Sequence, residues 1–338
     1  MKTLKTRKQI TRFIFCAALT VSALAAGARL FAQTPQAATG APAANAELQA
    51  FRAARNVAYE ISPADTDARI QRYTQNNIAM FKHGVAAKAT LLVFFSGTGG
   101  TPMSGWPFME AGANAGYRVI GLQYDNGISV PQTCGTNPDV TCSDRFREKR
   151  IFGDGVSNDI DDLPAESVVN RLTKLLQYLD AHHHKEGWGQ YMRNREIDWE
   201  RIVVSGHSQG GGVAAYIAKK EVVARAIVLS GAWDRVEDTK QLAPWVTSKS
   251  VTATDRWYGA YHEKERKADA MKVAYAAIGI PPAHIRVLTL PPNPETKMDP
   301  KLDVYHVSMV ATQVTPRDAN GNFAYASDWA FMLGRAAK

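Results

Sequence analysis

The sequence predicts an α/β protein whose mostly parallel central sheet is covered by helices on both faces. Short apolar segments, such as residues 89–95 and 201–205, alternate with amphipathic segments that have helical periodicity. The apolar segments are almost continuously hydrophobic, which is typical of strands buried on both faces of a parallel sheet. No linker-like stretch divides the chain after residue 48. We therefore expect one α/β domain over residues 49–338, with an insertion at about 126–160.

The strand and helix predictions follow the chain in order. Six segments are predicted as strands: 89–95, 117–123, 201–205, 225–229, 256–261 and 285–290. Helices are expected at about 211–220, 264–278 and 327–336, after an earlier helix that starts near Asp162. Asp162 would cap that helix, and Pro164 would lie in its first turn. Its apolar face consists of Val168, Leu172, Leu175, Leu176 and Leu179.

Composition and charge exclude several classes of protein. The chain has 338 residues, of which 45% are hydrophobic and 21% charged, as in folded globular proteins rather than disordered or fibrous ones. Six basic residues and no acidic one lie in residues 1–32. Without them, 34 basic side chains face 32 acidic ones, so the rest of the chain is nearly neutral. A nucleic-acid-binding surface is therefore not expected.

The N-terminus has the layout of a secretory signal peptide. A basic segment, 1–12, precedes a run of fourteen apolar residues, 13–26, and small residues then offer cleavage after Ala28 or Ala32. Fourteen residues fall short of the ~20 that span a bilayer, which argues against a retained anchor. We expect residues 1–32 to be removed, residues 33–48 to form a flexible Ala/Pro-rich leader, and the protein to be secreted or periplasmic.

Export would place the remaining cysteines in an oxidising compartment. Cys16 would leave with the signal peptide, so the mature chain keeps Cys134 and Cys142. An isolated pair in an oxidising compartment predicts one disulfide bond. Their spacing is not that of a zinc site, and no metal ligands are predicted elsewhere in the chain.

The strongest functional signal is Gly206-His207-Ser208-Gln209-Gly210. It comes directly after a predicted strand and directly before a predicted helix, as the G-x-S-x-G nucleophile elbow requires. A tight turn in this position projects the serine above the sheet edge and aims backbone N–H groups at developing negative charge. We expect Ser208 to be a nucleophile, and His207 to pack or bond locally rather than act as its base.

From about residue 80 onward the chain resembles the α/β-hydrolase superfamily. The resemblance lies in a strand followed by Gly97-Thr98-Gly99-Gly100, the GHSQGG elbow and a late histidine, and secreted bacterial members look most similar. It implies an eight-strand-type sheet and a catalytic triad in the chain order serine, acid, histidine. The pattern would make the chain a secreted serine hydrolase of the esterase or lipase kind.

The resemblance also implies where the other triad members lie. The base should follow the last strand, and His306 is the one histidine beyond residue 290. The acid should follow the strand at 256–261, where related sequences often have His-x-x-Asp and this chain has Glu265 in the fourth position. Glu265 is the preferred candidate, with Glu263 and Asp234 as alternatives.

An oxyanion hole needs two N–H donors. The N–H of Gln209, directly after the nucleophile, should supply one. The loop after residues 89–95 should supply the other, and we expect Thr98, with Gly99 as the alternative.

The predicted function is cleavage of a carboxylic ester through an acyl-enzyme, on a small-molecule or polymeric substrate. No cofactor, nucleic acid or stable membrane insertion is expected, since no nucleotide-binding motif and no long apolar segment follow the signal peptide. A peptidase or thioesterase would use the same residues. A non-catalytic binding protein of the same fold is the alternative from another class.

Overall fold

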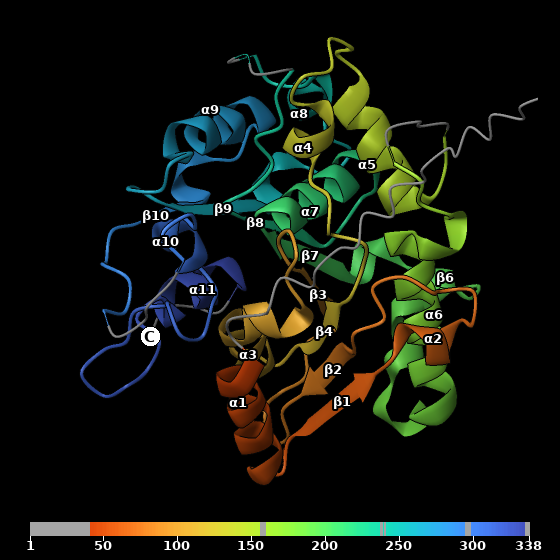
Figure 1. Cartoon of the computed structure of the whole chain (residues 1–338). Helices are drawn as coiled ribbons and strands as arrows, with labels where there is room; N and C mark the ends of the chain where they lie inside the picture. Colours follow the sequence, from red (N-terminus) through yellow and green to blue (C-terminus); the bar gives the residue numbers. More distant parts are fainter. Residues whose placement is uncertain (1–40, 156–159, 237–238, 240, 295–298, 335–338) are drawn as a thin grey trace, which may run out of the picture. The chain divides into compact units, whose positions relative to one another are not determined.

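The computed structural model describes residues 41–334 apart from 156–159, 237–238, 240 and 295–298 (Figure 1). All described residues belong to one unit, Ala38–Lys338. The predicted signal peptide, 1–32, and the first part of the predicted leader, 33–40, lie outside the described residues.

An eight-stranded sheet forms the centre of this unit, in the order β1-β2-β4-β3-β7-β8-β9-β10. The six strands from β4 to β10 are parallel, whereas β2 is antiparallel to both β1 and β4. The bounds are β1 Val57–Ile61, β2 Asn77–Phe81, β3 Leu91–Phe95, β4 Arg118–Leu122, β7 Ile202–His207, β8 Arg225–Leu229, β9 Trp257–His262 and β10 Ile285–Leu288. A separate ribbon pairs β5 Met192–Arg193 with β6 Glu196–Ile197. This confirms the predicted mostly parallel sheet.

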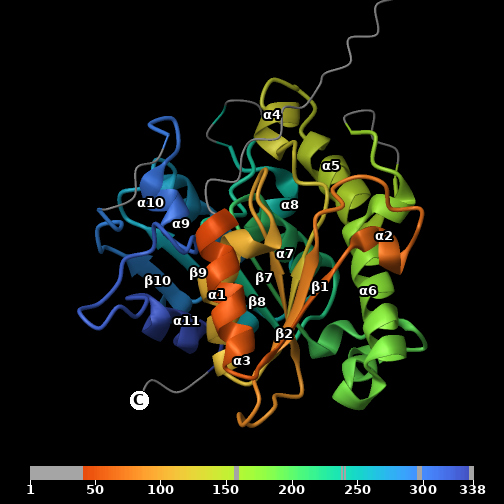
Figure 2. The ribbon, with the colours of Figure 1, turned by 60° about the horizontal axis from the view of Figure 1, so that its bottom comes forward.

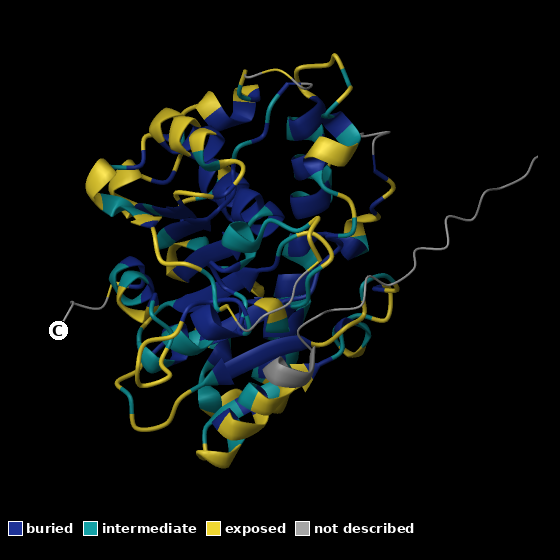
Figure 3. Cartoon of the chain, turned by 60° about the vertical axis from the view of Figure 1, so that its left-hand side comes forward, coloured by how far each residue is buried: buried dark blue, intermediate teal, exposed yellow. Residues whose placement is uncertain are grey.

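Helices cover both faces of the sheet (Figures 1 and 2). One face packs against α1 Ala41–Ala53, α3 Trp106–Asn114 and α11 Ala326–Met332. The other packs against α6 Val168–His182, α7 Gln209–Lys220, α8 Pro244–Thr247 and α9 Ala268–Ile278. Shorter or peripheral helices are α2 Pro63–Thr66, α4 Val130–Cys134, α5 Cys142–Phe152 and α10 Val304–Val307. Buried residues are concentrated in the strands and on the inner helix faces, while the outer helix faces are exposed (Figure 3).

The start of the folded body differs from the prediction. Residues 41–48 were expected to belong to a flexible leader, but α1 begins at Ala41 and Leu48 is 1% exposed in the core. One turn later, Phe51 packs edge-on against Trp106 with ring centroids 5.7 Å apart. Alanine, which made this segment look like a linker, is also the strongest helix former, and two apolar side chains are enough to dock the helix.

The helix predicted to start near Asp162 begins later. Ser167 is its N-cap and accepts a hydrogen bond from the Asn170 N–H. The Asp162 carboxylate instead accepts from Arg150 at 2.9 Å, so the predicted cap is wrong. The predicted apolar face of α6 is confirmed, and all five of its residues are fully buried.

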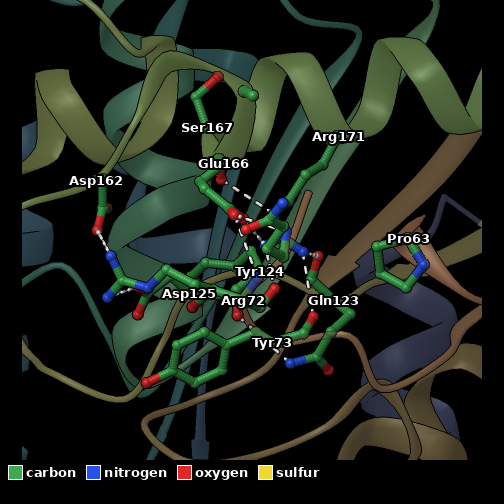
Figure 4. A network of polar contacts seen from close by, with 12 residues as sticks. Pro63, Arg72, Tyr73, Gln123, Tyr124, Asp125, Asp162, Glu166, Ser167 and Arg171 are labelled. Carbon is green, nitrogen blue, oxygen red and sulfur yellow. Dashed lines mark hydrogen bonds and ion pairs between the residues drawn. The ribbon is translucent and has the colours of Figure 1, made fainter. Parts of the chain in front are cut away.

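A buried network of charged side chains joins segments that are far apart in the sequence (Figure 4). Asp125, three residues after β4, pairs with Arg72 at 2.7 Å and with Arg150 of α5 at 3.5 Å. Arg171 of α6 pairs with Glu166 and donates to the carbonyl oxygen of Gln123 at 3.2 Å. The network thus fixes the path of the chain where it leaves β4.

The insertion at about 126–160 contains α4 and α5, and Cys134 and Cys142 lie at disulfide-bonding distance with Cα atoms 5.7 Å apart. Arg147 of α5 is nearly buried and forms a two-point ion pair with Asp234, at 2.5 and 2.8 Å. It also lies over the ring of Trp245, 5.1 Å from the centroid. The insertion is therefore anchored to the loop after β8.

Replacing Arg147 by leucine should lower the free energy of unfolding by about 3–5 kcal/mol, because the buried Asp234 carboxylate loses its cationic partner. Arg145→Leu on the same helix is the matched control, since its pair with Asp139 is exposed and should be worth less than about 1 kcal/mol. Urea denaturation of both variants measures the difference. Equal losses would contradict the anchoring role of Arg147.

Candidate active site

Ser208 lies at a sharp turn between the end of β7 and the start of α7, as the motif predicted. Its φ is 56° and its ψ −118°, a conformation that a residue with a side chain rarely adopts. The Ser208 N–H donates to the carbonyl oxygen of Leu229 at 2.9 Å, which ties the turn to β8. Two residues on, a Cβ on Gly210 would lie 2.0 Å from the carbonyl oxygen of Phe95, so the turn packs closely against the end of β3.

His306 contacts a carboxylate through its Nδ1 atom. It lies on the short helix α10 after the last strand, and its Nδ1 is 2.6 Å from Oε2 of Glu265. A carboxylate in this position favours the tautomer that carries its proton on Nδ1, which leaves a lone pair on Nε2. The imidazole is thereby oriented to accept a proton at Nε2.

Glu265 lies three residues after β9 and is buried. Its other oxygen, Oε1, accepts hydrogen bonds from the Ser230 hydroxyl at 2.9 Å and from the His262 N–H at 2.8 Å. These bonds hold the carboxylate with Oε2 directed at the imidazole.

The two alternative acids occupy other positions. Asp234 accepts hydrogen bonds from Arg147 and from the Trp245 indole, the latter at 3.0 Å. Glu263 is exposed. Glu265 is therefore the candidate that the structure brings to His306.

His207 brings the His306 loop up to the elbow. Its Nε2 donates to the carbonyl oxygen of His306 at 2.9 Å, and the two ring centroids are 4.5 Å apart. Because His207 is the residue next to Ser208, this bond places His306 beside the elbow. Burial first, and the neighbouring His306 second, hold the pKa of His207 well below 6.5. His207 is thus a neutral hydrogen-bond donor, which agrees with the local role predicted for it.

This buried histidine should make stability depend on pH. Its pKa is lower in the folded than in the unfolded chain, so the unfolded chain binds the extra proton, and the stability it contributes is lost as pH falls below about 6.5. His207→Gln, whose amide can still donate to His306, should lose less stability than wild type between pH 7.5 and 5. Melting temperatures of both proteins across this range test the prediction. Parallel curves would show that His207 does not contribute.

The two residues predicted as oxyanion donors, Thr98 in the loop after β3 and Gln209 at the start of α7, contact each other. The Thr98 hydroxyl donates to the side-chain oxygen of Gln209 at 2.8 Å, so the two candidate donors are linked. The Thr98 N–H has no acceptor among the described residues, whereas the Gly99 N–H donates to the carbonyl oxygen of Asn126 at 3.1 Å. Gln209 is the first residue of α7, where N–H groups lack acceptors within their own helix. This geometry favours Thr98 over Gly99.

Three residues that shape this site were not predicted from the sequence. Ser230 and the backbone of His262 hold Glu265, and Asn126 contacts the loop after β3. Ser230 and Asn126 are polar residues just beyond buried strands, where the carboxyl ends of parallel strands gather. That position is a usable signal, but it does not reveal the partner of each side chain.

The described residues contain no group of three or more His, Cys, Asp or Glu side chains that could hold a metal ion. Within the same part of the chain, no helix has the length and apolar character needed to cross a membrane.

Comparisons with known proteins give hydrolases among the solved structures. An esterase from the archaeon Pyrobaculum calidifontis is 11% identical with a TM-score of 0.36, covering 73% of this chain and 81% of that one. An alpha-beta serine hydrolase homologue from Coxiella burnetii is 14% identical with a TM-score of 0.38, covering 65% and 85%. An S-formylglutathione hydrolase from Staphylococcus aureus is 9% identical with a TM-score of 0.38, covering 69% and 89%. No family model and no curated protein matches the sequence.

The chain's own topology decides the fold. Seven of the eight strands run in the same direction and β2, next to the edge, is reversed. A strained turn carries Ser208 between β7 and the helix that follows it. A carboxylate and a histidine come later in the chain, after β9 and β10. We therefore identify this chain as an α/β-hydrolase-fold protein.

Proposed function

We propose that this protein is a serine hydrolase that cleaves a carboxylic ester. The observation that carries the proposal is the bond between His306 Nδ1 and the buried Glu265, placed beside a serine in a strained elbow conformation. A serine hydroxyl is a weak nucleophile until an imidazole can take its proton, and this arrangement supplies the imidazole in the required tautomer.

The proposed reaction proceeds in two steps. Ser208 Oγ attacks the ester carbonyl while His306 Nε2 takes its proton. The resulting oxyanion accepts hydrogen bonds from the N–H groups of Gln209 and Thr98. The C–O bond to the alcohol then breaks, and the alcohol leaves with the proton from His306. Water attacks the acyl-enzyme with His306 again as base, which releases the acid and restores Ser208.

Glu265 takes no proton from Ser208 in the proposed cycle and acts on His306 alone. It holds the imidazole by Nδ1 and stabilises the imidazolium that forms when Nε2 is protonated. The bonds from Ser230 and His262 keep its other oxygen occupied, so it cannot turn away from His306.

We further propose that residues 1–32 direct export and that the mature protein acts in the periplasm or the medium. The basic and apolar segments of the N-terminus support this, as does a cysteine pair at disulfide-bonding distance. The substrate would be a small-molecule or polymeric ester.

Covalent labelling tests the proposal most directly. The mature protein is treated with a fluorophosphonate, and its intact mass is compared with that of Ser208→Ala and of heat-denatured wild type. We expect one adduct on the folded wild type and none on the other two samples, followed by turnover of esters in a substrate panel. A well-folded wild type that takes no adduct would overturn the proposal and favour the non-catalytic binding protein.

A further inference from the structure

Asn126 is the centre around which the loop after β3 is folded. Its side-chain nitrogen, Nδ2, donates to the carbonyl oxygens of Gly97 and Gly100, both at 2.8 Å, and lies 3.0 Å from the Ser96 hydroxyl. The main-chain carbonyl oxygen of Asn126 accepts the Gly99 N–H at 3.1 Å. Asn126 is 1% exposed, so these bonds form away from water. One residue from another strand end therefore contacts four of the five residues of the loop 96–100.

The Thr98 N–H takes no part in the hydrogen bonds between Asn126 and the loop. The residues on either side of Thr98 are bound to Asn126, Gly97 through its carbonyl oxygen and Gly99 through its N–H. The peptide plane between Gly97 and Thr98 contains both the Gly97 carbonyl and the Thr98 N–H, which point in opposite directions in a trans peptide. The Gly97 oxygen accepts hydrogen bonds from Asn126 Nδ2 at 2.8 Å and from the Gly100 N–H at 3.0 Å, and together these bonds fix the direction of the Thr98 N–H.

The loop held in this way lies against the nucleophile. A Cβ on Gly97 would be 3.1 Å from Cβ of Ser208. Asn126 itself is held by its chain neighbour, because Asp125 forms an ion pair with Arg72 (Figure 4) and another with Arg150. The ion pairs of Asp125 thus hold the segment after β4 in place, and the Asn126 amide in turn holds the loop that faces Ser208.

We propose that Asn126 is a positioning residue for the oxyanion hole: its amide holds the Gly97–Thr98 peptide so that the Thr98 N–H is aimed at the oxyanion. This inference rests on the proposed function. A donor that is already oriented before the reaction stabilises the transition state without reorganisation, whereas a flipped peptide would present a carbonyl oxygen to the oxyanion.

Kinetics of Asn126→Asp test this role. The substitution keeps the shape of the side chain but turns the donor into an acceptor 2.8 Å from two carbonyl oxygens, which should turn the peptide away. We expect kcat to fall by about 10²–10³, the loss typical of one oxyanion donor, with KM changed little. Affinity for a boronic acid that mimics the tetrahedral intermediate should fall by a similar factor.

Asn77→Asp is the matched control. Asn77 is also buried, donates to the Ile61 carbonyl at 3.2 Å and accepts from the Gln123 N–H at 2.8 Å, but does not contact the loop 96–100. It should lose stability and keep the kcat of the folded fraction. If Asn126→Asp does not fold, the same kinetics are measured on Asn126→Ala, which removes the amide without introducing a charge.

The outcomes separate the two proposals. If the fluorophosphonate does not label the folded wild type, the proposed function is wrong, and the proposed role of Asn126 is wrong with it. A wild type that labels at Ser208 while folded Asn126 variants keep kcat and boronic-acid affinity within twofold overturns the positioning role alone. A KM increase at constant kcat would also overturn it, since that pattern reports lost ground-state binding.

Discussion

Ser208→Ala and His306→Ala are each expected to lower kcat by about 10⁶, as triad knock-outs do in other serine hydrolases. Without Ser208 no acyl-enzyme forms, and without His306 the hydroxyl keeps its proton. The geometry links the two, because His207 bonds to the His306 carbonyl and so places the base next to the elbow. Steady-state hydrolysis of an activated ester measures both losses.

The double variant should be no slower than either single variant, because the two residues act as a unit. Ser205→Ala is a suitable control for serine content, since its hydroxyl is buried on β7 and donates to the Val93 carbonyl at 2.8 Å. It should change stability rather than the chemical step. Losses that multiply in the double variant would contradict a shared proton transfer between Ser208 and His306.

Glu265→Gln should lower kcat by about 10⁴, the loss seen when the acid of a serine protease triad becomes an amide. The glutamine can retain the Oε1 contacts with Ser230 and His262. Its amide nitrogen would then face Nδ1 of His306 as a donor, which favours the tautomer with its proton on Nε2. In that tautomer the imidazole cannot accept the proton of Ser208.

Glu263→Gln is the control for this change. Glu263 is exposed, two residues from Glu265 and on the same loop, so the substitution should leave kcat within about twofold. Circular dichroism of both variants would show that the fold is kept. If Glu263→Gln or Asp234→Asn impaired the chemical step more than Glu265→Gln in folded protein, the assignment of the acid would be wrong.

The strands at the centre of the sheet could be predicted from the sequence, whereas the two at its N-terminal edge could not. The six parallel strands were predicted because each is mostly apolar, as is typical of strands covered on both faces of a sheet, although β10 at the edge is only partly buried. β1 and β2 were missed. Each has only five residues: β1, at the sheet edge, does not alternate regularly between buried and exposed positions, and β2 begins with a polar residue, Asn77. Segments this short give little periodicity to recognise. The leader was extended too far because Ala-rich segments can be helical or flexible, depending on what they pack against.

The site shows a similar division. Ser208 was found because the turn requires glycine two residues before and two residues after it, and this short pattern can be recognised in the sequence itself. The choice among Glu265, Glu263 and Asp234 depended on contacts across the fold: Arg147 binds Asp234, Glu263 faces solvent, and Glu265 meets His306. The contacts of Asn126 with the loop 96–100 join two strand ends, and no local pattern records them.

The backbone at Ser208 has a further consequence for the stability of the whole protein. A residue with a side chain at φ 56° and ψ −118° carries a conformational cost of about 1–3 kcal/mol. Folded proteins are held by only about 5–15 kcal/mol, so one residue consumes a noticeable share of that margin. Glycine would occupy the same position without this penalty but could not react. The backbone conformation that exposes the nucleophile therefore lowers the free energy of unfolding. A variant with glycine at this position would be more stable and inactive.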